Sequence, residues 1–262
     1  MDPNELYAVF DLETNGFRGA SAVSASSIIF TADGRIVDIF NRFYYPEERP
    51  SRRTEAVHGL TLGRIGRFRG EAPYPRHFLE DVPSLAAFWS SWDLRGIVVP
   101  NLSFDLSFLP RPLAKERKWW CSMRGLTDFC RLPPSSRSYG EFKWPRLAEA
   151  VRTARERLTP TAPLSEIEKS MVPPLSHYGL SDCFELYGLA VRVFNGLPEK
   201  PVFRSSTAPM TPPRREVYEI EPPREDDFVT ERLLYSSRLA EAAGIPERRK
   251  SPLLLWDQGE IP

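Results

Sequence analysis

The sequence predicts an α/β fold, with a mixed sheet of about five strands flanked by helices and a Pro-rich C-terminal tail. Three strand-like segments, residues 5–13, 22–31 and 35–45, are joined by short turns. Helical and strand-like segments then alternate, as in folds that pack helices against a sheet. With 262 residues, of which 41% are apolar, the chain can bury one sizeable core.

The composition narrows the class of protein. Lys+Arg and Asp+Glu both number 35, so any surface that attracts nucleic acid must be local. The cysteines Cys121, Cys130 and Cys183 have no CxxC spacing and fit neither a disulfide framework nor a zinc site. No run approaches the roughly 18 apolar residues of a membrane span, and the N-terminus lacks a signal-peptide pattern. We therefore expect a cytoplasmic protein without a membrane partner.

The first three strands are predicted to form a β-meander. Residues 7–10, "YAVF", are apolar, and the turn signal Asn15-Gly16 follows shortly after them. In "TADGR" the pair Asp33-Gly34 marks the turn between the second and third strands. Residues 46–80 are rich in Pro and Arg and are expected to form a loop.

Helices and strands are expected to alternate in the middle of the chain. The pattern indicates a helix over 82–93, a strand over 96–101 and a helical start at 103–109 that Pro110 and Pro112 interrupt. The next elements are a strand at 119–123, a helix at 144–157, an irregular Pro-bearing segment at 158–175 and a strong helix at 179–195. Apolar residues recur at helical spacing in the last helix, so one of its faces must be buried.

The composition changes after residue 196, where the compact domain is expected to end. The extension, residues 197–262, is rich in Pro and in charges of alternating sign, which is typical of extended linkers. It contains one predicted helix, residues 227–243, with Asp226 as N-cap and Gly244 as a stop signal.

Acidic residues recur where predicted strands end and helices begin. Asp11 and Glu13 end the first strand on one face, about 7 Å apart along it. Asp105 lies just inside a helix after a buried strand. Asp182 lies in the first turn of the 179–195 helix, whose positive end is expected to keep the carboxylate ionised. Such junctions meet at one edge of a mixed sheet, and like charges on one face favour a cation between them.

Four motifs, in this order, resemble the DnaQ-like or DEDDh family of 3′–5′ exonucleases. They are the D-x-E of Asp11 and Glu13 with Thr14 and Gly16, the "VHGLT" of residues 57–61, the N-x-x-F-D from Asn101 to Asp105, and the H-x4-D from His177 to Asp182. "CSMRGLTDFCRLP" and "YGEFKWPRLAEA" resemble the region that family members carry between the last two motifs. The resemblance covers residues 5–195 and implies a ribonuclease H-like fold.

The resemblance also implies two divalent metal ions, Mg²⁺ or Mn²⁺, and hydrolysis of phosphodiesters. By analogy with the family, Asp11 bridges both ions, Glu13 and Asp182 complete the site beside the attacking water, and Asp105 holds the other ion. His177 would take the proton of that water, a task that suits an imidazole at neutral pH.

Three positions depart from the family pattern. Pro100 replaces the His that commonly precedes the Asn of the third motif, and Tyr178 and Gly179 replace the Asp and Ala that often follow the catalytic His. All five catalytic positions are retained. The departures therefore bear on substrate preference and on helix length more than on activity.

Candidate substrate contacts surround these motifs. The segment 49–76 carries seven Arg against two Glu, and with Arg64, Arg67 and Arg69 it could follow a phosphate backbone or form a solvated loop. Further candidates from the family motifs are Thr14, Gly16, Phe17, His58, Leu60, Asn101 and Phe104. Leu60, Phe17 and Phe104 could pack on the terminal base or could belong to the core, and for Phe104 the core is the favoured interpretation.

The sequence therefore predicts a metal-dependent 3′–5′ exonuclease, residues 1–196, that acts on the 3′ end of single-stranded DNA in proofreading or repair. "VHGLT" and "FKWPRLAEA" favour DNA because they resemble proofreading members. The alternatives are an RNA-trimming exonuclease of the same fold and a non-catalytic nucleic-acid-binding scaffold subunit. The apolar segment 252–256 is expected to dock on the domain or in the groove of a protein partner.

Overall fold

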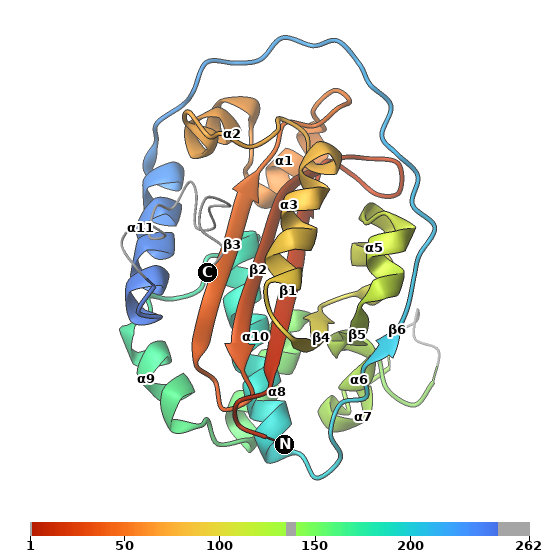
Figure 1. Cartoon of the computed structure of the whole chain (residues 1–262), viewed down its shortest axis with the longest axis vertical. Coiled ribbons are helices and arrows are strands. Elements are labelled where there is room, and N and C mark those ends of the chain that lie inside the picture. Colours follow the sequence, from red (N-terminus) through yellow and green to blue (C-terminus); the bar gives the residue numbers. More distant parts are fainter. Residues whose placement is uncertain (1, 135–139, 246–262) are drawn as a thin grey trace.

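A six-stranded mixed sheet forms the centre of the protein in the computed structural model, which describes residues 2–134 and 140–245 (Figure 1). Its strands are β1 (Leu6–Thr14), β2 (Ala22–Thr31), β3 (Ile36–Phe43), β4 (Leu94–Val99), β5 (Lys118–Cys121) and β6 (Arg204–Ser205). Their order is β3-β2-β1-β4-β5-β6. β2 is antiparallel to β1 and β3, as expected for the meander, whereas β4 is parallel to β1 and β5.

The sixth strand was not expected. β6 belongs to the extension and pairs antiparallel with β5, with Lys118 opposite Ser205. Two residues are too short to show an alternating pattern, so the sequence predicted about five strands. The extension therefore adds an edge strand to the sheet.

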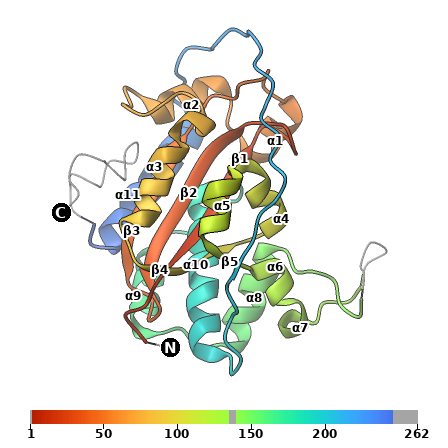
Figure 2. The same cartoon turned by 45° about the vertical axis from the view of Figure 1, so that its right-hand side comes forward.

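Helices cover both faces of the sheet (Figures 1 and 2). α3 (Phe78–Ser90) and α5 (Arg111–Glu116) lie on one face, and α8 (Leu147–Arg157) and α10 (Gly179–Gly196) lie on the other. Alternate side chains of β1 face the two layers. Ala8 and Phe10 belong to the apolar cluster that contains α3, and Tyr7 and Val9 to the cluster that contains α10. The same alternation puts the first two acidic candidates, on β1, on the α10 side.

Two segments expected to be irregular contain helices. They are α1 (Arg52–His58) and α2 (Leu62–Arg69) within 46–80, and α9 (Ala162–Ser170) within 158–175. Each begins after a hydroxyl N-cap, namely Ser51, Thr61 and Thr161, whose side chain accepts a hydrogen bond from an N–H of the first turn. Pro163 lies in the first turn of α9, where its missing N–H breaks no helical bond. The N-cap residues favour helices here, although the Pro and Arg content of these segments predicted irregular structure.

Short helical turns connect the remaining elements. They are α4 (Leu102–Asp105), the 3-10 turn η1 (Leu106–Phe108), α6 (Ser122–Gly125) and α7 (Thr127–Cys130). Pro110 precedes α5 and Pro112 lies in its first turn, so the helix expected at 103–109 ends early and a new one starts. α4 begins directly after β4, and this junction carries the third acidic candidate.

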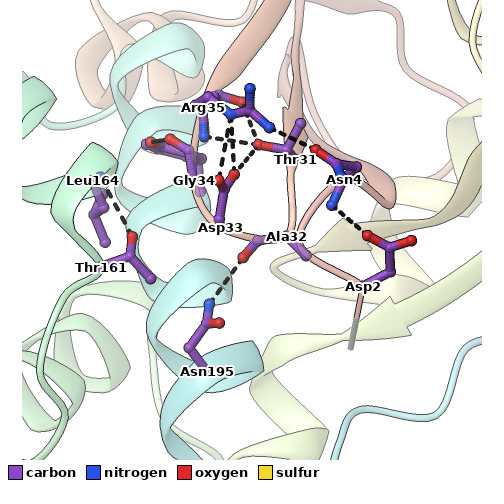
Figure 3. Close-up of polar contacts among 11 residues, drawn as sticks. Asp2, Asn4, Thr31, Ala32, Asp33, Gly34, Arg35, Thr161, Leu164 and Asn195 are labelled. Carbon is purple, nitrogen blue, oxygen red and sulfur yellow. Dashed lines mark hydrogen bonds and ion pairs between the residues drawn. The ribbon is translucent and has the colours of Figure 1, made fainter.

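Polar contacts hold the turn between β2 and β3 (Figure 3). The Thr31 hydroxyl contacts the Asp33 carboxylate and accepts a hydrogen bond from the Arg35 N–H at 2.9 Å. Asn195, near the end of α10, donates to the Ala32 carbonyl at 2.9 Å. The turn expected from the sequence is therefore confirmed, and it is tied to α10.

The described part of the extension crosses the molecule, and its helix packs against it. From β6 the chain runs along the outer edge to α11 (Asp227–Ala242), beside α2 (Figures 1 and 2). The Asp226 carboxylate accepts from the Val229 N–H at 3.1 Å, which confirms the expected N-cap. Val229, Tyr235 and Leu239 are buried in the same apolar cluster as α10. The apolar segment 252–256 lies outside the described residues. Within the described ranges, no helix combines the length and the apolar character needed to cross a membrane.

Candidate active site

Acidic side chains from three elements converge on the α10 side of the sheet. β1 contributes Asp11 and Glu13, α4 contributes Asp105, and α10 contributes Asp182 in its first turn. The charges of Asp182, Asp105 and Glu13 all act on Asp11, so the four carboxyl groups share one electrostatic environment. The convergence expected from the strand and helix junctions is present.

Two of these acids, together with His177, have the spacing of a metal site. One ligand atom each of Glu13, His177 and Asp182 lies within 4.8 Å of the other two. Two carboxylates and an imidazole at this separation can bind one divalent cation or one water molecule between them.

Burial and mutual repulsion raise the pKa values of the two acids on β1. The pKa of Asp11 lies well above its ordinary range because of burial first and then the charges of Asp182, Asp105 and Glu13. Burial and the charge of Asp182 raise the pKa of Glu13 to about 8, against an opposing effect of Arg232. Burial and repulsion therefore favour the protonated form of both carboxyl groups, whereas a bound cation would favour the charged form.

The other two acids respond in the same way. Burial raises the pKa of Asp105 to about 7, although the Asn101 N–H donates to its carboxylate at 3.1 Å. Burial and Glu185 raise the pKa of Asp182 to about 7, while the N–H of His177 opposes this shift. The helix end was expected to keep Asp182 ionised, but burial instead raises the pKa of this carboxyl group.

This donor set fits divalent metal ions. Four carboxylates supply oxygen ligands, which hard cations such as Mg²⁺ and Mn²⁺ prefer. A cation among them would reverse the repulsion that raises their pKa values. The sequence and the electrostatics of the folded chain therefore agree on a cation site.

His177 lies in an exposed turn directly before α10. Its backbone is left-handed, with φ of 55°. The Ser181 hydroxyl accepts from the Leu175 N–H at 2.9 Å, and the Tyr178 N–H donates to the Leu175 carbonyl at 3.2 Å, so hydrogen bonds close the turn. The imidazole is thus open to solvent on one side and beside two acids on the other.

A pocket of about 390 Å³ adjoins the acids. Glu13, Phe17, Val57 and Phe104 are among the residues that line it. Phe17 is 76% exposed, and its ring lies edge-on to that of Phe104 at 6.3 Å between centroids. An exposed aromatic ring beside a carboxylate cluster suits the stacking of a base.

The other residues of the motifs have structural contacts. The Thr14 hydroxyl donates to the Gly16 carbonyl at 2.7 Å, which shapes the rim of the pocket after β1. His58 is 4% exposed and accepts from the Leu60 N–H at 3.0 Å, and burial lowers its pKa to about 4. Leu60 is 3% exposed inside the apolar cluster of α10, so its interpretation as a core residue is confirmed.

Three arginines of the basic segment, Arg64, Arg67 and Arg69, already have partners within the chain. Arg69 is 7% exposed and donates to the carbonyls of Phe43, Tyr74 and Pro75, so the expectation that it contacts nucleic acid is wrong. Arg64 forms an ion pair with Asp226 at 2.9 Å, and Arg67 forms one with Glu225. Both acids belong to the extension. Arg64 and Arg67 would have to release these partners before they could bind phosphates.

Sequence reasoning missed the contribution of α11 to the site. Arg232 of α11 lies with its guanidinium over the rings of Phe228 and Tyr178, at 3.4 Å and 5.6 Å from their centroids. Its charge lowers the pKa of Glu13. The apolar pattern of residues 227–243 indicated a buried face, but it held no signal for the surface on which the helix packs.

The fold is similar to that of a solved structure. Cell-death related nuclease 4 (CRN-4) has a TM-score of 0.52 and 12% identity, over 77% of this chain and 67% of that chain. This likeness shows that the chain has the fold of that protein, and it agrees with the expected mixed α/β class. No protein-family model matches the sequence, and no curated protein matches it.

Two further structures have lower scores. Exonuclease X in complex with 5′-overhanging duplex DNA has a TM-score of 0.46 and 20% identity, over 71% of this chain and 89% of that chain. A structure described as the 3′-end-specific recognition of histone mRNA stem-loop by 3′-exonuclease has a TM-score of 0.44 and 16% identity, over 80% of this chain and 74% of that chain.

Proposed function

We propose that this protein is a metal-dependent 3′–5′ exonuclease that releases nucleotides from the 3′ end of single-stranded DNA. The observation that carries the proposal is the convergence of Asp11, Glu13, Asp105 and Asp182 with His177 beside an aromatic pocket. Four neighbouring carboxyl groups with raised pKa values cost stability, whether they are charged or protonated, so a functional role for the group is favoured over a structural one.

The four carboxylates would hold two divalent ions, Mg²⁺ or Mn²⁺, in the roles that the family resemblance implies. When bound, such ions activate water and stabilise the charge on the leaving oxygen of a phosphodiester. Glu13 and Asp182 lie beside His177, so these two acids and the imidazole would orient the attacking water. By the same resemblance, Asp105 would hold the other ion.

His177 would act as the general base. It would accept the proton of the attacking water, and its exposed position lets it return that proton to solvent. Phe17 and Phe104 would stack on the terminal base at the pocket, which fixes the scissile phosphate near the acids. Stacking is tolerant of sequence, so we expect little preference among bases.

DNA is proposed as the substrate because two sequence stretches resemble proofreading-type members. An RNA-trimming exonuclease of the same fold is the second candidate, since none of the five catalytic side chains reads a sugar hydroxyl. A non-catalytic scaffold subunit is disfavoured because the four acids would then lower the stability of the fold without serving catalysis.

Digestion of 5′-labelled DNA and RNA single strands with Mg²⁺ or Mn²⁺ tests the proposal. A 3′–5′ exonuclease gives a descending ladder from the 5′-labelled strand, and a chelator abolishes it. A faster ladder on RNA would select the second candidate. Binding without cleavage in either metal, with Glu13→Gln behaving like the wild type, would select the scaffold.

The segment 252–256 is proposed to bind a protein partner or the domain itself, in a protein that we propose to be cytoplasmic. Because α11 contributes to the core, the test keeps residues 1–245 and replaces the segment by alanines. Lower thermal stability would favour docking on the domain. Unchanged stability and activity with loss of a pull-down partner would favour a protein groove.

A further inference from the structure

α11 lies against the turn that carries His177. Tyr178, the next residue, is 3% exposed and its ring lies between two elements. It stacks nearly parallel to Phe43 of β3, at 6.4 Å and 9°, and edge-on to Tyr235 of α11, at 6.0 Å and 85°. The residue that follows the candidate base is therefore fixed from the sheet and from the extension.

A buried chain of hydrogen bonds joins the same elements. Asn41 of β3 donates to the Tyr178 hydroxyl at 3.2 Å, and this hydroxyl contacts the Ser236 hydroxyl of α11 at 2.6 Å. Ser236 also donates to the Arg232 carbonyl at 3.0 Å, and the Tyr178 hydroxyl lies 3.4 Å from the same carbonyl oxygen. Asn41 and Ser236 are 1% and 0% exposed. Buried hydrogen bonds of this kind restrict the geometry of the side chains that form them.

The backbone of His177 needs such support. Its left-handed conformation is unfavourable for a residue with a Cβ, and such residues persist only where the surroundings hold them. Ser181 and Leu175 fix the turn on the side of α10, and Tyr178 fixes the chain directly after the histidine. Loss of the Tyr178 anchor would let His177 relax away from Glu13 and Asp182.

We infer that Ser236 of α11 is a positioning residue for His177 and acts through the hydroxyl of Tyr178. The C-terminal extension thereby completes the active site, which a plain linker would not do. This inference rests on the proposed function for its catalytic consequence. Its structural part is that Ser236 holds the His177 turn in place, and this can be tested by a measurement that does not depend on catalysis.

The matched pair Ser236→Ala and Ser237→Ala tests the catalytic part in the full chain. Both changes delete one hydroxyl from adjacent positions of α11, but Ser237 is exposed. We expect Ser236→Ala to lower kcat by roughly 10- to 100-fold, as small displacements of catalytic groups do, with KM unchanged at a temperature where every variant is folded. Tyr178→Phe should reproduce the loss, and the double variant should be no slower than either single one.

Amide hydrogen exchange of residues 175–182 tests the structural part. Exchange in this turn should be faster in Ser236→Ala than in Ser237→Ala, while exchange in β1 and β2 stays the same. Unchanged exchange and unchanged kcat in both Ser236→Ala and Tyr178→Phe would overturn the inference. A wild-type protein that does not cleave DNA or RNA would refute the proposed function alone, and the exchange result would still decide the role of Ser236.

Discussion

Asp105→Asn should stabilise the metal-free protein at alkaline pH while it abolishes activity. Asp105 is 2% exposed, and its pKa is about 7 in the folded chain against an ordinary value of 3.8. Between these two values the unfolded chain binds fewer protons than the folded one, so stability falls as pH rises. The neutral amide has no such proton to lose, and its oxygen can still accept from the Asn101 N–H.

The magnitude follows from the shift. At about 1.4 kcal/mol per pKa unit, the cost of ionising Asp105 approaches 4 kcal/mol above pH 7 and vanishes below pH 4. The variant should therefore exceed the wild type in free energy of unfolding by about 4 kcal/mol at pH 8 and by less than about 1 kcal/mol at pH 4.

Urea unfolding in EDTA at pH 4, 6 and 8 measures this difference. Asp93→Asn, an exposed acid in the loop before β4, serves as the control and should show no pH-dependent gain. With Mg²⁺ or Mn²⁺ added, the wild type should gain stability and Asp105→Asn should gain less. A variant that is less stable than the wild type at pH 8 in EDTA would refute the reasoning, because it would show that the ionised carboxylate is favourable in the fold.

Four further outcomes are expected. His177→Ala should lower kcat by roughly 10²–10⁴-fold with single-strand affinity nearly unchanged, and unchanged turnover would leave it as a structural turn residue. In thermal scans Mg²⁺ should raise Tm more at pH 8 than at pH 5, since the pKa values near 7 to 8 leave the acids protonated at pH 5; an equal rise would contradict the site. Asp81→Asn should lower the free energy of unfolding in urea by about 3–5 kcal/mol, because it breaks the buried ion pair with Arg42 at 2.7 Å. A decrease below about 1 kcal/mol would contradict a stabilising role for this ion pair. Gly59→Ala should destabilise by more than about 1 kcal/mol, since φ there is 73° and the added Cβ would meet the Phe228 ring; a neutral result would mean that α11 is not docked there.

Much of the candidate site could be predicted because its signals are local. Asp11 and Glu13 share a face through strand alternation alone, and Asp105 and Asp182 each follow a recognisable junction. The ionisation of Asp182 could not be predicted in the same way. The start of the helix, and with it the position of the helix dipole, can be predicted from the sequence. The loss of water around the carboxylate depends on which residues pack over it in the folded chain.

The sequence by itself determined the order of β1 to β5, the position of the acids at strand and helix junctions and the turn that carries His177, because each depends on residues close together in the chain. Only the tertiary structure decided the fate of the basic segment and of the extension. Arg64 pairs with Asp226 across the chain, and Ser236 reaches Tyr178 through a helix whose docking surface is built by other elements. Such contacts depend on which surfaces meet in the folded chain, and no local pattern of charge or hydropathy specifies that choice.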